Sequence, residues 1–502
     1  MKLQKINPGV VAVLAGILTT LSFSPFGIWP LAVAGPALLF WLWLNKQGSG
    51  FRLGLLYGLG LMGSGVTWLH VSIAQFGNLG WFFPILVTAV FALLMALYYG
   101  LVGWLSGFFM GGERLKLLAV YPTLWVLVEW FRGWFLSGFP WLELGHAHVG
   151  TPLAGYGPVL GGLGVSWAVA LSAGLLLLLI RSQTTRWYAA SGLLLLWLAG
   201  WGLLQVQWSQ PLGAALKVGL VQGNIPQAQK WEMDQLLPSL RLYATRTREH
   251  LGLDLIVWPE TAVSAFQYQV DEPFLQPLEK ALKERGSQLV FGVVQLDEDG
   301  KRYYNAMVAM GDQRDLYHKR HLVPFTEYLP FKSLLWPLVD LFTIPMSDFT
   351  AGSRPKPLMQ VGQHPVGMSI CYEDAFGSEM VQALPEAAYL INASNDAWFG
   401  DSMAPHQHLQ IARMRALEAG RYLLRSTNTG ISAIIGPKGE LIATSPLLEE
   451  DVLKGEVQPL SGSTPYGRFG NLAILALLSV VLIIGFPCGH ARFRDRCGLD
   501  GD

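Results

Sequence analysis

Long apolar stretches fill the first 207 residues of the chain, and one more lies near its end. We place them at about residues 8–24, 28–45, 52–73, 82–110, 116–136, 160–180, 187–206 and 470–487. Each stretch is about long enough to cross a hydrocarbon core of ~30 Å as a helix. The pattern predicts an α-helical transmembrane bundle of eight spans, seven in residues 1–207 and the eighth at the start of residues 470–502.

Residues 208–469 follow a different pattern, in which short apolar runs alternate with polar segments of helical period. The runs predict strands at 216–222, 253–258, 288–294, 303–310, 364–370, 387–392, 422–427, 430–436 and 452–457. The polar segments predict helices at 232–250, 272–285, 374–384 and 406–419. Several strands are apolar throughout, which is typical of sheets covered on both faces. We therefore expect an α/β layered domain with its own core.

The composition agrees with a membrane protein. Hydrophobic residues make up 52% of the 502 residues and charged residues only 14%, which is too apolar for an ordinary soluble protein. Lys plus Arg and Asp plus Glu both total 35, so the chain has no overall basic field to hold nucleic acid. A nucleic-acid partner is therefore not expected.

The positive charges in the short loops predict the orientation, because Lys and Arg are retained on the cytoplasmic side. With the N-terminus inside, that side holds Lys2, Lys5, Lys46, Arg52, Arg114, Lys116, Arg181, Arg186, Arg492, Arg494 and Arg496. The short loops of the other side offer little beyond Arg132. The first apolar stretch has no small-residue cleavage site, so we expect an uncleaved helix. This orientation exports residues 208–469 and leaves both termini in the cytoplasm.

The exported domain then contains a single cysteine. Cys371 lies within it, whereas Cys488 and Cys497 lie in the cytoplasmic tail, so no disulfide can form inside the domain. A lone thiol in an oxidising compartment is either a buried small hydrophobe or a group needed for chemistry. Cysteine usage alone leaves both interpretations open.

Three reactive side chains follow predicted strands. Glu260 follows "DLIVWP", Lys319 follows "DLYH", and Cys371 follows "VGMSI". Residues beyond the carboxyl ends of strands line the ligand crevice of α/β sheets, so these groups could converge. Each one alone is more often structural, as a helix cap, a solvated lysine or a core cysteine. Together, a thiol, a carboxylate base and an ammonium group for the oxyanion are the equipment of acyl transfer.

Several motifs also resemble a known family. They are "WPE" at 258–260, "YHKRHLVPFTEYLP" at 317–330, "CYE" at 371–373, "NASNDAWFG" at 392–400, "QGNIPQAQKW" at 222–231 and "RMRALEAGRYLLRSTNTGISAIIGPKGE" at 413–440. The first four resemble the Glu-Lys-Cys arrangement of the nitrilase superfamily. With the last two motifs and the eight predicted spans, the chain resembles the apolipoprotein N-acyltransferases of bacterial inner membranes over nearly its full length.

This resemblance implies a fold, a reaction and a set of site residues. The exported domain would be a nitrilase-like αββα sandwich. A phospholipid such as phosphatidylethanolamine would donate an acyl chain to a cysteine thioester, which would then acylate the α-amino group of the N-terminal S-diacylglyceryl-cysteine of a lipoprotein. Glu260 would be the base, Lys319 the oxyanion stabiliser and Cys371 the nucleophile. The resemblance further implies supporting roles for Glu327, Tyr372 and Glu373. Substrate contacts are expected for Trp231, Trp398, Phe399 and His406, although the aromatic residues Trp231, Trp398 and Phe399 could equally belong to the core. It implies no cofactor, and we expect a monomer.

Two residues depart from the family pattern. Thr326 stands in "PFTEY" where members often have Gly, and His406 stands in "APHQH" where Trp is frequent. The reaction should be intact, but the fit of acyl donors is left open, as are the preferred acyl chain and headgroup.

Other features are weaker signals. "HAH" at 146–148 and "HQH" at 406–408 provide too few ligands at the right spacing for a metal site, so none is predicted. Glu129 and Arg132, at i and i+3 near a span end, are either functional or a structural ion pair. Small residues at 54–65 predict close helix packing. A membrane-tethered amidase or nitrilase remains an alternative function, and a transporter is disfavoured because the spans carry few charges besides Glu129.

Overall fold

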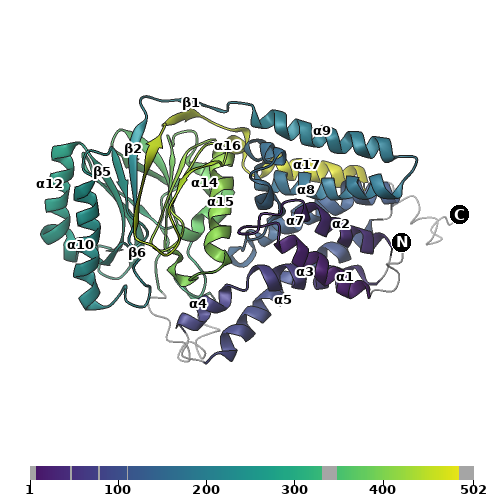
Figure 1. Ribbon diagram of the computed structural model, residues 1–502, viewed down its shortest axis with the longest axis horizontal. Helices are drawn as coiled ribbons and strands as arrows, with labels where there is room; N and C mark the ends of the chain where they lie inside the picture. The colour runs from purple at the N-terminus through teal and green to yellow at the C-terminus, as the bar shows by residue number, and fades with distance from the viewer. Residues whose placement is uncertain (1–6, 46–47, 77–79, 110, 331–347, 486–502) are drawn as a thin grey trace. The chain divides into compact units, whose positions relative to one another are not determined.

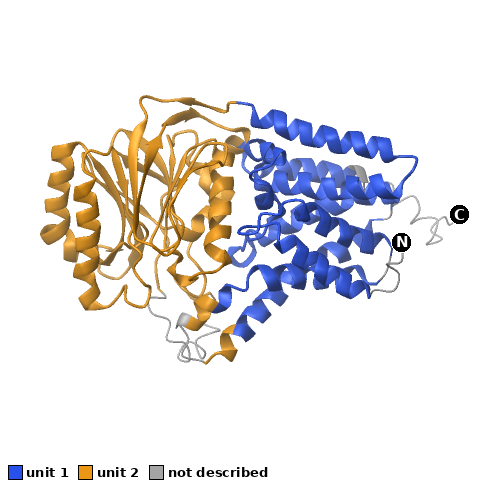
Figure 2. Ribbon diagram, in the orientation of Figure 1, with its two compact units in different colours: residues 1–70, 85–206, 469–502 blue, residues 71–84, 207–468 orange. Residues whose placement is uncertain are grey.

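The computed structural model describes residues 7–45, 48–76, 80–109, 111–330 and 348–485 (Figure 1). It divides into two compact units, residues 1–70, 85–206 and 469–502 in one and residues 71–84 and 207–468 in the other (Figure 2). Some residues used in the sequence analysis lie outside the described ranges, namely Lys2, Lys5, Lys46, Cys488, Arg492, Arg494, Arg496 and Cys497.

The first unit is helical. Its main helices are α1 (Pro8–Thr20), α2 (Leu31–Leu44), α3 (Gly50–Gly65), α5 (Phe82–Leu105), α7 (Tyr121–Arg132), α8 (Gly157–Arg181), α9 (Arg186–Leu204) and α17 (Leu472–Gly485). Within the described residues, three segments are long and apolar enough to cross a membrane, namely Phe82–Phe108, Pro152–Arg181 and Arg186–Leu204. Pro8–Thr20, Leu31–Leu44 and Leu472–Ile483 are shorter apolar helices. The predicted apolar stretches are thus helical, while the count of eight crossings stays a prediction.

Glycines allow the helices of this unit to approach closely. A Cβ on Gly60 of α3 would lie 2.1 Å from the carbonyl oxygen of Val13 in α1, and a Cβ on Gly54 would lie 2.1 Å from that of Tyr99 in α5. Side chains at these positions would force the helices apart. The close packing predicted for residues 54–65 is therefore confirmed.

The hydrogen bonds that the structure gives Glu129 and Arg132 go to other groups, so whether the two residues are functional or a structural ion pair stays open. In the described structure, the Glu129 carboxylate accepts hydrogen bonds from Trp125 Nε1 (2.9 Å) and from the backbone amide of Leu144 (3.1 Å). Arg132 instead donates to the carbonyl oxygen of Trp141 (2.7 Å). Both side chains are buried, and they hold residues 141–144 against α7 because backbone groups there need partners.

The second unit contains two large sheets. One has the order β13-β12-β11-β10-β9-β8, with β8 (Leu358–Val361), β9 (His364–Ile370), β10 (Leu390–Ser394), β11 (Leu423–Thr427), β12 (Ala433–Ile435) and β13 (Leu441–Thr444). The other has the order β14-β2-β3-β5-β6-β7, with β4 beside β5. Its strands are β2 (Leu216–Gln222), β3 (Leu255–Val257), β4 (Val263–Phe266), β5 (Gln288–Leu296), β6 (Tyr303–Met310), β7 (Asp315–His318) and β14 (Asp451–Val457). A short pair, β1 (Ser209–Pro211) and β15 (Leu460–Gly462), lies apart from both.

Helices cover the outer faces of the two sheets. One core cluster joins Val218 and Leu220 of β2 to Val366 and Met368 of β9, so these sheets pack face to face. A second cluster packs the seven-stranded sheet against α10 (Met233–Glu249) and α12 (Gln276–Arg285). A third packs the six-stranded sheet against α14 (Gly377–Met380) and α15 (Met403–Ala419). The result is the αββα sandwich implied by the resemblance (Figure 1).

Most predicted strands and helices of this unit are present. Strands 216–222, 303–310 and 364–370 coincide with β2, β6 and β9. The strand ranges predicted from the sequence omit β1, β4, β7, β8, β13 and β15, which are short, although the run "DLYH" before Lys319 is strand β7. β13, with the sequence LIAT, lies at the exposed edge of its sheet. The predicted helix 374–384 is wrong as one element. A 3₁₀ turn, η8 (Cys371–Ala375), occupies its start, so α14 begins only at Gly377.

Candidate active site

Cys371 is the first residue of η8 and directly follows strand β9. Its φ is 51°, in the left-handed region, which costs a residue with a Cβ about 1–3 kcal/mol. The side-chain amide of Asn392 donates a hydrogen bond to the Cys371 carbonyl oxygen (3.2 Å), and the sulfur is hydrogen-bonded to the Ser394 hydroxyl. Strand β10 therefore holds both the backbone and the thiol of Cys371 in this strained turn.

The environment of Cys371 favours the neutral thiol. Burial raises the pKa of the thiol well above its ordinary value, and the carboxylate of Glu260 raises it further. The ammonium group of Lys319 opposes these two effects without cancelling them. Because the thiolate is the attacking form, a base must remove the proton as the sulfur reacts.

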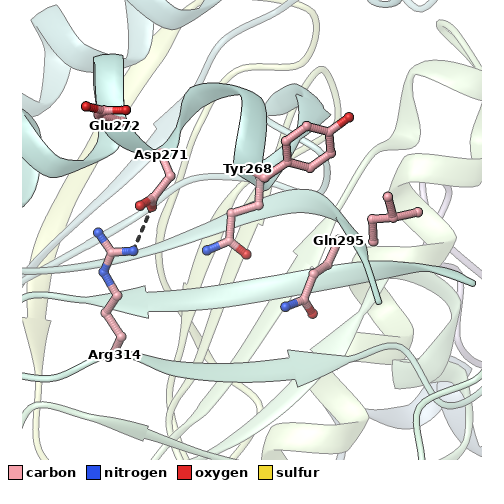
Figure 3. Close-up of a pocket in the computed structure, with 7 residues that line it drawn as sticks. Tyr268, Asp271, Glu272, Gln295 and Arg314 are labelled. Carbon is pink, nitrogen blue, oxygen red and sulfur yellow. Dashed lines mark hydrogen bonds and ion pairs between the residues drawn. The ribbon is translucent and has the colours of Figure 1, made fainter. Parts of the chain in front are cut away.

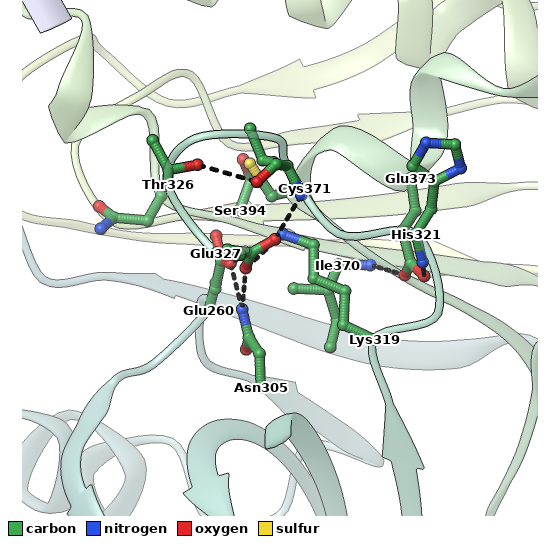
Figure 4. Close-up of polar contacts among 12 residues, drawn as sticks. Glu260, Asn305, Lys319, His321, Thr326, Glu327, Ile370, Cys371, Glu373 and Ser394 are labelled. Atoms are coloured by element: carbon green, nitrogen blue, oxygen red, sulfur yellow. Dashed lines mark hydrogen bonds and ion pairs between the residues drawn. The ribbon is translucent and has the colours of Figure 1, made fainter. Parts of the chain in front are cut away.

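Four polar side chains meet beside Cys371, and we call them the Lys319 cluster: Glu260, Asn305, Lys319 and Glu327 (Figure 4). Lys319 Nζ lies 2.9 Å from Glu327 Oε1 and 3.5 Å from Glu260 Oε1. Asn305 Nδ2 donates to Glu260 Oε1 (2.7 Å) and to Glu327 Oε1 (3.1 Å). All four residues are buried. The structure thus brings together the three reactive side chains that follow predicted strands.

The seven-stranded sheet positions this cluster. Glu260 follows β3 after Trp258 and Pro259, and the Trp258 amide donates to the Val290 carbonyl oxygen of β5 (2.8 Å). Lys319 follows β7, and its own amide donates to the Asn305 carbonyl oxygen of β6 (2.9 Å). Backbone pairing therefore continues up to Lys319 and to within two residues of Glu260, which limits the movement of both side chains.

Lys319 remains an ammonium group despite its burial. Burial alone would lower its pKa, but Glu327 and Glu260 outweigh that effect and raise the pKa above its ordinary value. A permanent positive charge here can stabilise an oxyanion that develops near the sulfur.

Glu373 connects the Cys371 turn to the Lys319 loop. Its Oε2 accepts from the Ile370 amide (2.7 Å), and its Oε1 accepts from the amides of Arg320 (2.7 Å) and His321 (3.1 Å). Tyr317 Oη donates to the same carboxyl group. Burial raises the pKa of Glu373, although these backbone amides oppose the shift. Glu373 therefore fixes the distance between the two loops.

Sequence reasoning missed two residues of the site, Asn305 and Lys230. Asn305 lies among apolar residues of β6, and a polar side chain in such a strand was the available signal. Lys230 is buried, and its Nζ donates to the Glu260 carbonyl oxygen (3.0 Å). Burial lowers the pKa of Lys230 to about 8, although Glu260 and Cys371 oppose the shift. The sequence analysis assigned a substrate contact to the adjacent Trp231, but no feature of the sequence indicated that Lys230 is buried.

The remaining expected site residues lie around this centre. Tyr372 follows the thiol, and its ring contacts His321 (5.9 Å between centroids) and Phe376 (5.1 Å). Trp231 is 41% exposed. Trp398, Phe399 and His406 are partly buried, at the end of η10 (Asp396–Trp398) and in the first turns of α15. Their contacts with substrate stay predictions.

A surface pocket elsewhere in this unit contains none of these residues (Figure 3). It is lined by Gln267, Tyr268, Asp271, Glu272, Gln295, Leu296 and Arg314. Arg314 already pairs with Asp271 (2.7 Å) and Glu279 (2.6 Å), so its charge is satisfied within the protein. The half-buried Cys371 and its charged neighbours, rather than this pocket, carry reactive chemistry.

Comparison with known proteins adds to this geometry. Residues 217–466 match the family model of carbon-nitrogen hydrolases, and residues 15–175 match that of the apolipoprotein N-acyltransferase N-terminal domain. Among solved structures, Saccharomyces cerevisiae Nit3, a member of branch 10 of the nitrilase superfamily, is similar with a TM-score of 0.38 and 19% identity, over 50% of this chain and 93% of that chain. A carbon-nitrogen hydrolase from Helicobacter pylori G27 gives a TM-score of 0.38 and 16% identity, over 49% and 90%.

Relatives named apolipoprotein N-acyltransferase match nearly the whole chain. The protein from Methylococcus capsulatus is 44% identical over 95% of both chains. Those from Nitrosomonas europaea and Coxiella burnetii are 38% and 36% identical, over 95% of this chain and 96% and 99% of theirs. These matches include both the helical region and the thiol-bearing sandwich. The chain belongs to the apolipoprotein N-acyltransferase family.

Proposed function

We propose that this protein moves an acyl chain from a membrane phospholipid, such as phosphatidylethanolamine, to the α-amino group of an S-diacylglyceryl-cysteine at the N-terminus of a lipoprotein. Between the two steps, the acyl chain would be held on Cys371 as a thioester. The observation that carries this proposal is a half-buried cysteine in a left-handed turn beside a buried ammonium group and two carboxylates. Family membership supplies the substrate class.

In the first step, the sulfur of Cys371 attacks the ester carbonyl carbon while Glu260 accepts the thiol proton. The carbonyl oxygen becomes an oxyanion, and the Lys319 ammonium group stabilises it. The C–O bond then breaks, and the lysophospholipid alkoxide leaves with the proton held by Glu260. The products are a thioester on Cys371 and a lysophospholipid.

In the second step, the free α-amine attacks the thioester carbon and loses a proton to Glu260. The C–S bond breaks, the thiolate of Cys371 takes that proton, and an amide remains on the lipoprotein. Glu327 would keep Lys319 in place, and Glu373 would keep the two loops together. Trp231, Tyr372, Trp398, Phe399 and His406 would contact the substrates or border the site.

The membrane arrangement is part of the same proposal. Eight spans would place residues 208–469 on the periplasmic side of the bacterial inner membrane and both termini in the cytoplasm, where both lipid substrates could meet Cys371. The charge distribution in the short loops supports this orientation. Reporter fusions after residue 210 should give an exported signal, and a cytoplasmic signal would contradict the arrangement.

The decisive experiment separates acyl transfer from hydrolysis, since the carbon-nitrogen hydrolase match makes an amidase the competing function. The purified full chain, mixed with acyl-labelled phospholipid, should gain one hydroxylamine-sensitive acyl group at Cys371. A diacylglyceryl-cysteine peptide with a free amine should then remove the label, whereas the same peptide with a blocked amine should not. Release of free fatty acid at one rate with either peptide would instead establish a hydrolase.

A further inference from the structure

A second buried group of charges lies behind Cys371, and we call it the His408 cluster: Asp374, Asp396, His408 and Arg425. Each is at most 2% exposed. Asp374 belongs to the Cys371 turn, and Asp396 begins η10 after β10. His408 lies in α15 and Arg425 in β11. The cluster therefore joins the reactive turn to the six-stranded sheet and its covering helix.

The four side chains form a closed ring of charge-assisted hydrogen bonds. His408 donates from Nε2 to Asp374 Oδ1 (2.8 Å) and from Nδ1 to Asp396 Oδ1 (3.0 Å). Arg425 donates to the second oxygen of each carboxylate, 3.2 Å from Asp374 Oδ2 and 2.8 Å from Asp396 Oδ2. Two cations thus bridge the same two anions, and the formal charges cancel.

His408 is an imidazolium in this arrangement. Both ring nitrogens face carboxylate oxygens, which accept hydrogen bonds, so both nitrogens act as donors and carry protons. Burial and Arg425 would lower the pKa of His408, but Asp374 and Asp396 outweigh them and raise it to about 9. Although burial alone would raise the pKa of Asp396, Arg425 and His408 hold it below its ordinary value. With neither nitrogen free, the ring cannot ligate a metal ion, in agreement with the weak metal signal of "HQH".

The cluster reaches Cys371 by two further routes. Arg425 donates to Asn392 Oδ1 (2.6 Å), and the other end of that amide donates to the Cys371 carbonyl oxygen. Asp396 Oδ1 accepts from the Ser394 hydroxyl (3.1 Å), which is the group hydrogen-bonded to the sulfur. The orientation of both side chains that contact Cys371 therefore depends on the closed ring.

We propose that His408 is a positioning residue for the acyl-transfer reaction, which ties Asp374 to Asp396 and thereby keeps the Cys371 thiol aimed at Glu260 and Lys319. The proposal rests on the proposed role of Cys371 as nucleophile. His408 does not contact the reacting atoms. Without its two hydrogen bonds, the strained turn at Cys371 could relax, and small misplacements of reacting groups are costly to rate.

The test uses the full chain, purified in detergent, with three variants. His408→Gln removes one of the two donors and the positive charge. His408→Gln with Asp374→Asn replaces the ion pair by two amides that can bond to each other without a buried net charge. Arg421→Gln is the control, because Arg421 is equally buried and donates to the carbonyl oxygens of Ala387 (2.6 Å) and Gly462 (2.7 Å), but has no part in the ring.

Each variant is assayed for kcat and KM of acyl transfer from phospholipid to a saturating diacylglyceryl-cysteine peptide, per folded molecule. His408→Gln should lower kcat by about 10- to 100-fold and leave KM for phospholipid within about 2-fold. The double variant should recover about 3-fold or more of that loss, since the bond between the two positions is restored. Arg421→Gln should lower thermal stability while keeping kcat near the parent value.

Two outcomes would overturn the proposal. In the first, the kcat of His408→Gln equals that of Arg421→Gln. In the second, His408→Gln lowers kcat and the double variant does not restore it, which is the result expected from simple loss of packing. Cys371→Ala distinguishes failure of this inference from failure of the proposed function. If Cys371→Ala still transfers acyl chains, the proposed function fails. If it is inactive while His408→Gln is normal, only the positioning role fails.

Discussion

The Lys319 cluster and the His408 cluster lie on the two sheets of one sandwich and differ in charge. The Lys319 cluster belongs to the seven-stranded sheet and contains two carboxylates and one ammonium group, a formal surplus of one negative charge among its four side chains, and the ammonium group of Lys230 lies outside it on the Glu260 carbonyl oxygen. The His408 cluster belongs to the six-stranded sheet and α15, and its two carboxylates face two cations. A surplus carboxylate can accept a proton, whereas a balanced ring gains nothing by doing so. One sheet is thus suited to chemistry and the other to holding Cys371.

The largest effect is expected when the surplus charge of the Lys319 cluster is neutralised. Glu260→Gln keeps the shape of the side chain but removes the base, so acyl-enzyme formation should fall by about 10²- to 10⁴-fold in a single-turnover assay. Asn305 can still hydrogen-bond to the new amide oxygen, so the fold should be intact. Glu249→Gln, an exposed change in α10, is the matched control. A normal burst of acyl-enzyme in Glu260→Gln would exclude Glu260 as the base.

The second prediction removes the cation from the same cluster. Lys319→Met should slow acyl-enzyme formation by about 10²- to 10³-fold, because the oxyanion loses its stabilising charge. It should also lower the melting temperature, since Glu260 and Glu327 would be left buried without their counter-ion.

Adding Glu327→Gln to Lys319→Met separates these two effects. The melting temperature should rise again because one of the unpaired carboxylates is gone, but the rate should not recover. Lys356→Met, in an exposed pair with Glu386, should change neither quantity. Recovery of the rate in the double variant would assign Lys319 a purely structural role.

The third prediction concerns the balanced ring and pH. The pKa of His408 is about 9 in the folded chain against a reference of 6.5, so the unfolded chain binds fewer protons between these values. His408 should therefore contribute about 3 kcal/mol of stability below pH 6.5, and this contribution is lost as the pH rises towards 9. The apparent melting temperature should fall across this window in the parent and much less in His408→Gln.

The titration of Lys230 sets the upper limit of the pH range in which the melting temperatures of the parent and His408→Gln can be compared. Its folded pKa of about 8 lies below the reference of 10.5, so it adds stability as the pH rises from 8 towards 10.5. Melting temperatures are best compared between pH 6.5 and 8, which lies inside the window of His408 and below that of Lys230, and the difference between the parent and His408→Gln isolates the contribution of His408. Parallel curves for the parent and His408→Gln in that range would contradict an imidazolium held by two carboxylates.

The two clusters also differ in how far the sequence could predict them. Glu260, Lys319 and Cys371 follow apolar strands, and the edge of a sheet brings strand ends together, so the pattern could suggest their meeting. No comparable rule predicts the His408 cluster from the sequence, because α15 packs on β10 and β11 only through tertiary contacts. Its one signal was Arg425 in the apolar run "LLRST", since a fully buried guanidinium group requires acidic partners. The spacing of residues along the sequence does not show which acidic residues are the partners of Arg425.

In the fold as well, elements determined by local sequence pattern were predicted, whereas an element determined by tertiary contacts was not. Buried strands such as β2 and β9 were predicted to the residue, because both of their faces need apolar side chains. The helix expected at 374–384 failed because side chains of Glu373 and Asp374, bonded to distant elements, impose the 3₁₀ turn that starts at Cys371. Local propensity could not reveal those bonds.

The smallest effect is expected from a substitution of Thr326, which lies beside the Lys319 cluster and carries no charge. Thr326 precedes Glu327, and its hydroxyl donates only a long hydrogen bond to the Val323 carbonyl oxygen (3.3 Å). Glu327 is held instead by its own contacts, since Oε2 accepts from the Val323 amide (2.8 Å) and Oε1 accepts from Lys319. Thr326→Gly should therefore cost about 0.5–1 kcal/mol of stability through added backbone freedom. Its kcat should stay within about 3-fold of the parent, because a change of 1.4 kcal/mol in the barrier is needed for tenfold. Thr326→Ser, which keeps the hydroxyl, should match the parent in both kcat and melting temperature. A large loss of kcat in Thr326→Gly with Lys319 and Glu327 unchanged would mean that the turn itself, and not the charge surplus, governs the reactivity of Cys371.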